Sequence, residues 1–469
     1  MQSKVSRIVC IGGGHCNVQV MKMLKQVMPG SAKMTLLTEA PNAYYSGMLP
    51  GAISHLYKDE DIQIQLKPLA HWCKADYIER RVHAINANEN RIILEGDGEV
   101  QYDYLAVNVG SRTRGANETK GVKEHSLSTR PINDLLGKIE HKEAQLIRDN
   151  IIPEVVVCGG GAAGIEMAFG FKRRWSDLFK QEIHVSIISA DPTVLYGSDE
   201  SLRTEINRKF KEKNIDLYIN GKVQEINENC VILADGRVIP CNVAVWATGA
   251  EPQKMIGRSN LDILNGYIRV NDNMQSTSHP NIFGGGDCVT MQTFAEKRFP
   301  PKAGVYAVRA GPYIAQNLAN SINGVPLTTY VPQSGFLALL MTGDGKAIGS
   351  KFGIAFAGKW VWNMKDYIDR SFMKLFNPNY LFKDFQTRGY EEPLENNELF
   401  ENEKSDEKQV TDKIRERINA LNSKDSAVTL LAGEDHEEFF EQLFVLDRMA
   451  RDEHFCNEVV DNFRQLKNK

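Results

Sequence analysis

The sequence of 469 residues contains no apolar run that approaches the roughly 20 residues needed to span a bilayer. Its start, MQSKVSRIVCIGGG, lacks the charged, apolar and small-residue order of a secretory signal. We therefore expect a reducing, cytoplasmic compartment. The net charge of -4 gives no case for nucleic acid as a partner, and the 42% of hydrophobic residues is typical of a soluble globular protein with a large core.

The cysteines are few and scattered. The eight of them form neither a CxxC pair nor a zinc-like spacing, so the sequence predicts no metal site. Cys10 and Cys158 lie inside predicted strands, where we expect them to act as small buried hydrophobic residues.

The stretch IVCIGGGHCNV (8–18) has most of a dinucleotide-binding turn. The first glycine of that motif permits a tight turn, the second lets the backbone approach a pyrophosphate, and the third allows close helix–strand packing. Gly12 and Gly14, followed by His15, keep the phosphate-facing roles, whereas Asn17 stands where the third glycine belongs. A slightly splayed helix would absorb that change. A glycine-rich structural turn is the alternative.

A second turn matches the motif fully. Residues 155–168 read VVVCGGGAAGIEMA, in which an apolar strand runs into Gly159, Gly161 and Gly164. The second turn starts 147 residues after the first, about one nucleotide-binding domain later. Two such domains explain the first 250 or so residues better than a single domain with a chance glycine cluster.

A carboxylate at the end of the strand after each turn would bind a ribose. Glu39 ends the strand MTLLTEA after the first turn. After the second turn, the strand HVSIISADP ends at Ser189, with Asp191 two residues on. The choice between NADH and NADPH stays open, with a slight preference for NADH because Asp191 would repel a 2′-phosphate.

Two later segments fit the same plan. VAVWATGAEP (243–252) is a strand followed by a turn at Gly249. HPNIFGGGDCVT (279–290) is a short strand that ends at Gly286 and Asp287. Asp287 would accept a hydrogen bond from a polyol such as a flavin's ribityl chain, or is an ordinary turn-capping residue.

In order, IGGGHCNV, YDYLAVNVGS, VVVCGGGAAGIEMA, VAVWATGAEP and NIFGGGDC resemble the two-dinucleotide-binding-domain flavoproteins of the pyridine nucleotide-disulfide oxidoreductase superfamily. The resemblance implies an α/β fold in which a Rossmann-like NAD(P)H domain is inserted into a Rossmann-like FAD domain. It places Glu39 at the adenosine ribose, Asp287 at the ribityl chain and Glu166 near the nicotinamide ribose.

A narrower likeness lies in NAYYSGMLPGAISHLY, PPKAGVYAVRAGP and FAGKWVWNMKDYIDRSFMKLF. These segments are similar to the oxidoreductase module associated with selenide, water dikinases, and to type II NADH dehydrogenases and sulfide:quinone oxidoreductases. The likeness implies that Ser46 and Gly47 line the flavin and that Lys302 lies beside its isoalloxazine ring. A solvated loop lysine is the alternative for Lys302. Cys288 is the one cysteine that the motifs bring near the flavin.

Departures from these families limit the chemistry. The stretch PNAYYSGMLPGAISHL lacks the CxxxxC pair of disulfide reductases. Gly304 and Val308 stand where type II NADH dehydrogenases have two quinone-site glutamines. Asn108-Val109-Gly110 replaces the common Ala-Thr-Gly, which we interpret as tolerated because the chain still turns on glycine.

The sequence therefore predicts an FAD-dependent NAD(P)H dehydrogenase with a non-disulfide, small-molecule acceptor, of which a quinone is the leading choice. One alternative is a redox-sensing flavoprotein that binds NAD(P)H and acts through a protein partner. Another is an oxidoreductase of sulfur or selenium compounds, which would use Cys288. The candidate catalytic residues are Lys302, as a cation beside the flavin, and Cys288.

The domain boundaries follow from these motifs and from composition. The expected segments are an FAD domain in two parts (1–118 and 253–325), an NAD(P)H domain (119–252), an interface region (326–390), an acidic linker (391–410) and a helical appendage (411–469). The interface region is of a kind that superfamily members use for homodimers. Its basic, aromatic helix at 359–378 either lies on a membrane surface or packs against protein.

Overall fold

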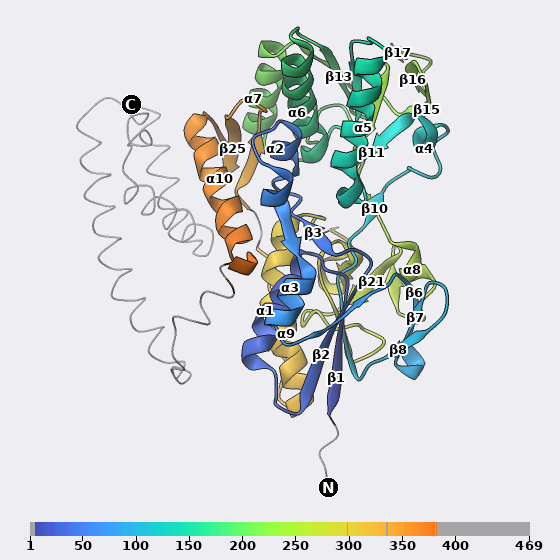
Figure 1. Ribbon diagram of the computed structural model, residues 1–469, viewed down its shortest axis with the longest axis vertical. Coiled ribbons are helices and arrows are strands. Elements are labelled where there is room, and N and C mark those ends of the chain that lie inside the picture. The colour runs from blue at the N-terminus through green and yellow to red at the C-terminus, as the bar shows by residue number, and fades with distance from the viewer. Residues whose placement is uncertain (1–4, 298, 334–335, 352, 380, 382–469) are drawn as a thin grey trace, which may run out of the picture.

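The computed structural model describes residues 5–297, 299–333, 336–351, 353–379 and 381. These residues form an α/β structure with two five-stranded parallel sheets, as the sequence predicts. The two sheets lie one above the other in Figure 1. The expected acidic linker and helical appendage lie outside the described residues.

The lower sheet holds the first glycine-rich turn. Its order is β22-β9-β1-β2-β5, with every neighbouring pair parallel. The strands are β1 (Ser6–Ile11), β2 (Ala32–Thr38), β5 (Asp76–Glu79), β9 (Tyr104–Val107) and β22 (Ile282–Gly284). Helices α1 (His15–Val27) and α9 (Gly304–Asn323) run side by side against it (Figure 1). Because helices cover the sheet, its strands are rich in apolar residues.

The upper sheet holds the second turn and has the order β11-β18-β12-β13-β14, again all parallel. Its strands are β11 (Ser126–Ser128), β12 (Glu154–Cys158), β13 (His184–Ile188), β14 (Ile215–Tyr218) and β18 (Val243–Trp246). All five precede β22 in the chain and follow β9. The upper sheet is therefore inserted between two strands of the lower one, as the fold class predicts.

Each of the two parallel sheets has a small antiparallel sheet associated with it, and helices flank both. A three-stranded antiparallel sheet accompanies each, built from β6 (Val82–Asn86), β7 (Arg91–Leu94) and β8 (Glu99–Gln101) in one case and from β15 (Val223–Asn227), β16 (Cys230–Leu233) and β17 (Val238–Pro240) in the other. The upper sheet is flanked by α5 (Leu135–Arg148), α6 (Ala162–Phe179) and α7 (Glu200–Glu212). Cys10 and Cys158 are 0% and 1% exposed, which confirms that they are buried.

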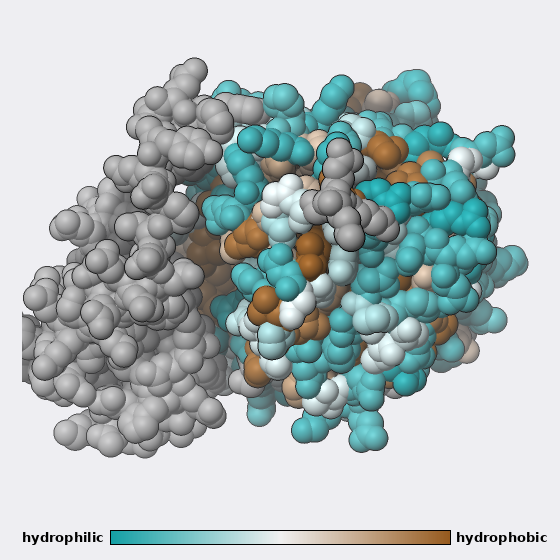
Figure 2. Space-filling model, turned by 90° about the horizontal axis from the view of Figure 1, so that it is seen from below, coloured by the Kyte–Doolittle hydropathy of each residue, from teal (hydrophilic) through white to brown (hydrophobic). Residues whose placement is uncertain are grey.

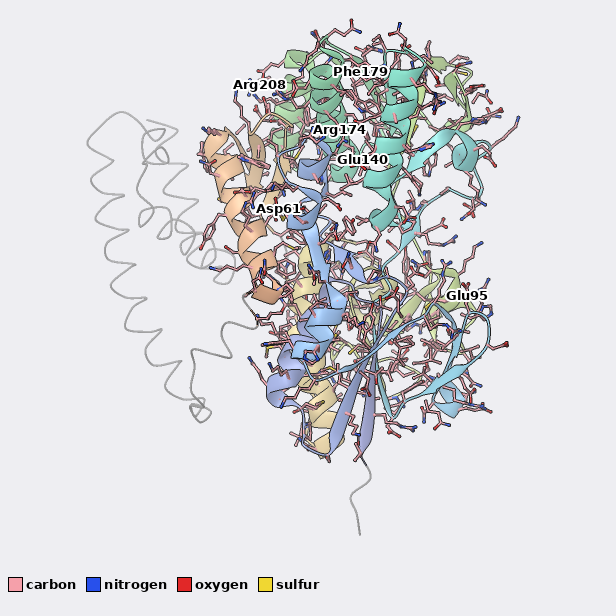
Figure 3. All side chains as sticks on the ribbon, in the orientation of Figure 1. Asp61, Glu95, Glu140, Arg174, Phe179 and Arg208 are labelled. Atoms are coloured by element: carbon pink, nitrogen blue, oxygen red, sulfur yellow. The ribbon has the colours of Figure 1, made fainter. Side chains whose placement is uncertain are left out.

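A buried arginine, itself held in an ion pair, joins the two parts of the molecule. Arg174 of α6, labelled in Figure 3, is 5% exposed and pairs with Glu143 of α5. Its guanidinium also donates to the carbonyl oxygen of Ile53 at 3.3 Å, at the end of the short helix α2 (Leu49–Ile53). Removing one partner of such a pair would leave a buried charge uncompensated. Arg174 thus ties the inserted domain to the segment that follows the first ribose strand.

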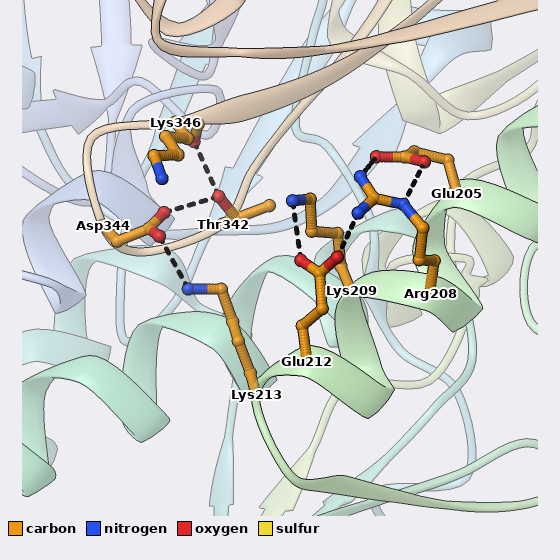
Figure 4. A network of polar contacts seen from close by, with 8 residues as sticks. All are labelled: Glu205, Arg208, Lys209, Glu212, Lys213, Thr342, Asp344 and Lys346. Carbon is orange, nitrogen blue, oxygen red and sulfur yellow. Dashed lines mark hydrogen bonds and ion pairs between the residues drawn. The ribbon is translucent and has the colours of Figure 1, made fainter.

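The C-terminal described region is an antiparallel sheet and a helix. Strands β24 (Ala338–Met341), β25 (Ala347–Lys351) and β26 (Ile354–Gly358) precede α10 (Lys359–Lys374). The turn between β24 and β25 contacts α7, because Lys213 Nζ lies 2.7 Å from Asp344, which also accepts a hydrogen bond from Thr342 at 2.6 Å (Figure 4). The region is thereby fixed to the inserted domain.

The aromatic residues of α10 contact the chain itself. The ring of Trp360 stacks on Phe356 with 5.2 Å between centroids, and the ring of Trp362 lies 5.5 Å from Tyr57. Of the two interpretations of this helix, packing against protein is the one that these contacts favour. In the described part of the chain, no helix combines the length and apolarity needed to cross a membrane. On the face seen in Figure 2, hydrophilic residues surround small groups of apolar ones.

Candidate functional site

The first glycine-rich turn joins β1 to α1 at the carboxyl end of the lower sheet. Gly12 has φ +85°, and a side chain there would collide with the carbonyl oxygen of Asn108. Helix α1 begins at His15 with Gly14 as its N-cap. The positive end of a helix and its unpaired backbone amides therefore face the site, which is the arrangement that binds phosphates.

Asn17 does more than replace a packing glycine. It is 1% exposed, and its side-chain Nδ2 donates to the carbonyl oxygens of Ile11 and Gly12, both at 2.9 Å, and of Ala106 at 3.3 Å. Hydrogen bonds to the ends of β1 and β9 thus fix the helix at the position where the motif has its third glycine. That a slightly splayed helix absorbs the change stays a prediction, and the side-chain amide of Asn17 adds hydrogen bonds that the motif does not indicate.

A cavity of about 890 Å³ opens over this turn. Residues from both parts of the molecule line it, among them Gly12, Gly14, His15, Glu39, Ser46, Arg81, Asn108, Arg130, Asp287, Lys302 and Gly304. Among the predicted flavin-site residues, the structure therefore brings together those of the first turn, Glu39, Ser46, Asp287 and Lys302, whereas Gly47 and Gly286 are not among the lining residues. A cavity of this size falls within the range of cofactor sites.

Glu39 lies at one end of the cavity. Its carboxylate is 2.9 Å from the guanidinium of Arg81, which follows β5, and both side chains are more than half exposed. Glu95, labelled in Figure 3, lies 3.8 Å from the same arginine. Arg81 therefore holds Glu39 at the place where the sequence predicts a ribose.

Asp287 lies in the turn after β22. Its carboxylate accepts a hydrogen bond from Ser111 Oγ at 2.9 Å and lies 3.7 Å from the guanidinium of Arg130. An ordinary turn-capping residue would bond its own turn. Asp287 instead bonds residues that are distant in sequence, and it lines the cavity.

Lys302 lines the same part of the cavity. Its ammonium donates to the carbonyl oxygen of Val289 and lies 4.0 Å from the centre of the Tyr267 ring. Burial lowers the pKa of Lys302, an effect that Asp287 and Cys288 oppose. Lys302 is thus a held, partly buried cation rather than a solvated loop lysine.

Cys288 and Cys16 are both 0% exposed. The thiol of Cys288 donates to the carbonyl oxygens of Gly285 at 3.3 Å and Val107 at 3.4 Å, and burial raises its pKa to about 11. Burial also raises the pKa of Cys16, well above the usual value of a thiol. Because the thiolate is the nucleophile, these pKa directions favour structural roles for both cysteines.

The second turn joins β12 to α6. A side chain at Gly164 would collide with the carbonyl oxygen of Gly159, whereas the space beside Gly161 is open. Gly161 is the N-cap of α6, so its helix end faces outward as that of α1 does. Gly249 follows β18, next to the guanidinium of Arg114. The second turn is separate from the cavity over the first.

Glu166 is on α6 and meets α10 and the segment at Gly47. It is 9% exposed and accepts a hydrogen bond from the backbone of Met341 at 2.9 Å. Burial raises its pKa to about 7, against the opposing effect of Lys365. Lys365 donates to the carbonyl oxygen of Gly47 and to Asp369, each at 2.7 Å. A titratable carboxyl group therefore lies in a buried ionic cluster that contacts Gly47, the neighbour of Ser46 in the cavity wall.

Two cavity-lining residues, His15 and Thr113, each have a buried side-chain atom, Nε2 and Oγ1, without a hydrogen-bond partner within the described chain. The Nε2 atom of His15 is buried and makes no hydrogen bond there, and burial lowers the pKa of this imidazole. The ring packs edge-on against Tyr45, with 5.2 Å between centroids. A buried imidazole nitrogen without a partner fits a site whose ligand supplies one.

The model of the pyridine nucleotide-disulphide oxidoreductase family matches residues 6–311. The chain belongs to this family. A type II NADH:quinone oxidoreductase from Staphylococcus saprophyticus is 24% identical over 399 residues, which are 80% of this chain and 98% of that protein. A probable NADH dehydrogenase from Dictyostelium discoideum is 26% identical over 274 residues, 52% of this chain and 58% of its own.

Solved structures share the fold of this family member. The sulfide:quinone oxidoreductase from Aquifex aeolicus superposes with a TM-score of 0.68 at 20% identity, covering 81% of this chain and 94% of that one. NDH2 from Plasmodium falciparum superposes with a TM-score of 0.67 at 14% identity, covering 83% and 100%.

Sequence reasoning missed several residues of this family member's site. Arg81, Ser111 and Arg130 partner the predicted carboxylates, and no motif marks them because they lie in loops far from those carboxylates in sequence. The pair Lys365 and Asp369 left a usable signal, an i, i+4 pair of opposite charge on a helix otherwise rich in aromatic residues.

Proposed function

We propose that this protein is an FAD-dependent NAD(P)H dehydrogenase that passes electrons to a non-disulfide acceptor, of which a quinone is the leading candidate. FAD would be bound by residues 1–118 and 253–325, and NAD(P)H by residues 119–252. The proposal is carried by the cavity, which spans a ribose-type carboxylate at Glu39, a glycine-rich turn and a polar end at Asp287 and Lys302. The family match and the full-length likeness to type II NADH:quinone oxidoreductases support it.

The residues present fit FAD. Glu39 would take the adenosine ribose, the amides of Gly13 to His15 the diphosphate, and Asp287 the ribityl hydroxyls. Lys302 would stabilise negative charge on the ring system, because it is a held cation in the cavity wall. When bound, FAD supplies two-electron chemistry, taking a hydride from NAD(P)H and passing electrons to the acceptor.

A substrate disulfide is a poor acceptor for this site. Reducing one through the protein needs a pair of reactive cysteines, and the cysteines nearest the cavity are buried with raised pKa values. Gly304 stands in the cavity wall, where quinone-reducing relatives have a glutamine. A quinone held there would make its polar contacts with other groups.

Quinone reduction consumes protons as well as electrons. Glu166 has a pKa raised to about 7, so near neutral pH it is close to half protonated. The carbonyl oxygen of Gly47 and the ammonium of Lys365 connect its surroundings to the cavity wall. Glu166 does not itself line the cavity, so a proton that it supplies would have to pass through this buried cluster.

The test is anaerobic stopped-flow of the purified, flavin-loaded chain with NADH and with NADPH, followed by reoxidation with a soluble quinone. We expect fast flavin reduction and fast reoxidation by the quinone. A purified protein that neither carries nor binds FAD would overturn the proposal. A reduced state that persists against quinone, sulfur electrophiles and air would instead favour the sensing function through a protein partner.

A further inference from the structure

Asn17 and Asn108, two departures from the expected motifs, form the strongest cluster that the motifs themselves do not explain. Both are buried, at 1% and 4% exposed, and both depart from the pattern of the resembled flavoproteins. Two departures that meet in space are better explained together than as separate tolerated changes. Asn108 also lines the cavity.

Asn108 joins two parts of the proposed FAD site. Its Oδ1 accepts hydrogen bonds from the backbone amides of Cys16 at 3.1 Å and Asn17 at 3.4 Å, in the first turn of α1. Its Nδ2 donates to the carbonyl oxygen of Gly285 at 2.7 Å, next to the turn that carries Asp287. One side chain thus links the diphosphate-facing helix end to the ribityl-facing turn.

Two glycines leave room for this amide. A side chain at Gly14 would collide with Oδ1 of Asn108, and one at Gly286 would come within 2.5 Å of its Nδ2. The amide of Asn108 therefore occupies the space between the first turn and the Asp287 turn.

Asn17 completes the arrangement from the helix side. The strand-end carbonyl groups of Ile11, Gly12 and Ala106 need donors, and the side chain of Asn17 supplies them. At the helix end the neutral amide of Asn108 accepts from the backbone without placing a negative charge beside the proposed diphosphate site. The two asparagines therefore together fix the start of α1 against the strand ends and against the turn that carries Asp287.

We propose that Asn17 and Asn108 are a coupled pair of positioning residues that set the spacing between the diphosphate-binding and ribityl-binding parts of the FAD site. The inference rests on the proposed FAD function. It predicts that a chain with only one of the two asparagines binds FAD more weakly than the unchanged chain. The resembled families commonly have glycine and alanine at these positions.

The experiment measures FAD dissociation constants for the full-length apoprotein by fluorescence titration. The variants are Asn17→Gly, Asn108→Ala and the double variant. Each single change should raise the Kd for FAD about tenfold, the scale expected for lost buried hydrogen bonds. The double variant should raise it by clearly less than the product of the two single effects, since coupled sites are not additive.

The matched control is Asn317→Ala. Asn317 of α9 is 0% exposed and makes three comparable hydrogen bonds, to Asn273 and Thr328, but it does not line the cavity. It should lower the melting temperature and leave the Kd for FAD within twofold. If a single variant does not fold, Asn17→Ser or Asn108→Ser is measured in its place.

Singles that bind FAD as the unchanged protein does, effects that multiply in the double variant, or a control that weakens FAD equally would each overturn the inference. Failure of the unchanged protein to bind FAD would overturn the proposed function instead, so the two failures are distinguishable.

Discussion

In the turn at Gly12 the helix is tied to the sheet by amide side chains, whereas in the turn at Gly159 the bare backbone of Gly164 lies against the preceding carbonyl group. Both turns join a buried parallel strand to a helix, and both leave a helix end free to face a phosphate. The same job is therefore done once by hydrogen bonding and once by close packing. The consequence is that the two turns should fail under different substitutions.

The largest effect is expected from Gly164→Ala. The added methyl group would overlap the carbonyl oxygen of Gly159, and backbone on both sides leaves little room to adjust. We expect a loss of about 3 kcal/mol in the free energy of unfolding, together with loss of NADH binding. Thermal unfolding followed by circular dichroism, and NADH titration, measure the two.

Gly137→Ala is the control for that change. Gly137 lies within α5 with open space beside it, so alanine should stabilise the helix by about 0.5–1 kcal/mol. Equal melting temperatures for Gly164→Ala and the unchanged protein would mean that the second turn is not held by contact, and the comparison of the two turns would fall.

Asn17→Asp tests the first turn by changing chemistry at constant shape. A carboxylate cannot donate to the carbonyl groups of Ile11 and Gly12, and it would be buried beside them. We expect a loss of about 2–3 kcal/mol in chemical denaturation at pH 8. The loss should shrink at low pH, where a protonated carboxyl group regains one donor. Asn150→Asp, at an exposed position, should change stability little.

A second difference is electrostatic, because the helix after the second turn carries buried Glu166 and α1 has no acidic residue. Burial raises the pKa of Glu166 from 4.5 to about 7 in the folded chain. Between those pH values the folded state keeps the proton that the unfolded state releases, so the free energy of unfolding falls as pH rises through this window.

Glu166→Gln should remove that dependence. The neutral amide does not titrate, so we expect the variant to lose about 2 kcal/mol less stability than the unchanged protein between pH 4.5 and 7. Urea denaturation at several pH values measures the two slopes. Parallel profiles would show that Glu166 ionises in the folded chain as readily as in the unfolded one.

Much of this architecture was predictable from local pattern. Unbroken apolar runs such as VVVC identify buried parallel strands, and the glycine spacing identifies the turns that follow them. The insertion of the second sheet was implied by the family resemblance that the order of those motifs carries, and the structure shows it in the strand before Asp287, which pairs with β9 of the first sheet.

The unpredicted part consists of contacts between segments distant in sequence. The hydrogen bonds of Asn17 could not be predicted from the motif, because its partners Ala106 and Asn108 lie about 90 residues away in sequence. Lys365 reaches Gly47 across 318 residues, so no local period indicates it. Contacts of this kind depend on which segments the folded chain brings together, and no local sequence pattern records that.

The smallest effect is expected at the ribose end of the second turn, where the two domains differ again. In the first domain Glu39 is held by Arg81, but in the second the hydroxyl of Ser189 is already bonded to the carbonyl oxygen of Thr193 at 3.1 Å. Asp191 is exposed and is the carboxylate near that strand end. If NADH is preferred, the negative charge of Asp191 repels the 2′-phosphate of NADPH. Because solvent lies between the two charges, this repulsion is weak.

Asp191→Asn should therefore lower the ratio of kcat/KM for NADH over NADPH about fivefold, equivalent to about 1 kcal/mol, chiefly by improving NADPH. Asp97→Asn changes the net charge equally but lies in the turn between β7 and β8 of the first domain, and it should leave the ratio unchanged. A ratio that moves with both variants would point to the overall field of the protein. A ratio that changes with neither variant would mean that the second turn recognises the ribose through backbone groups. The same turn already holds its helix through backbone contact, at Gly164.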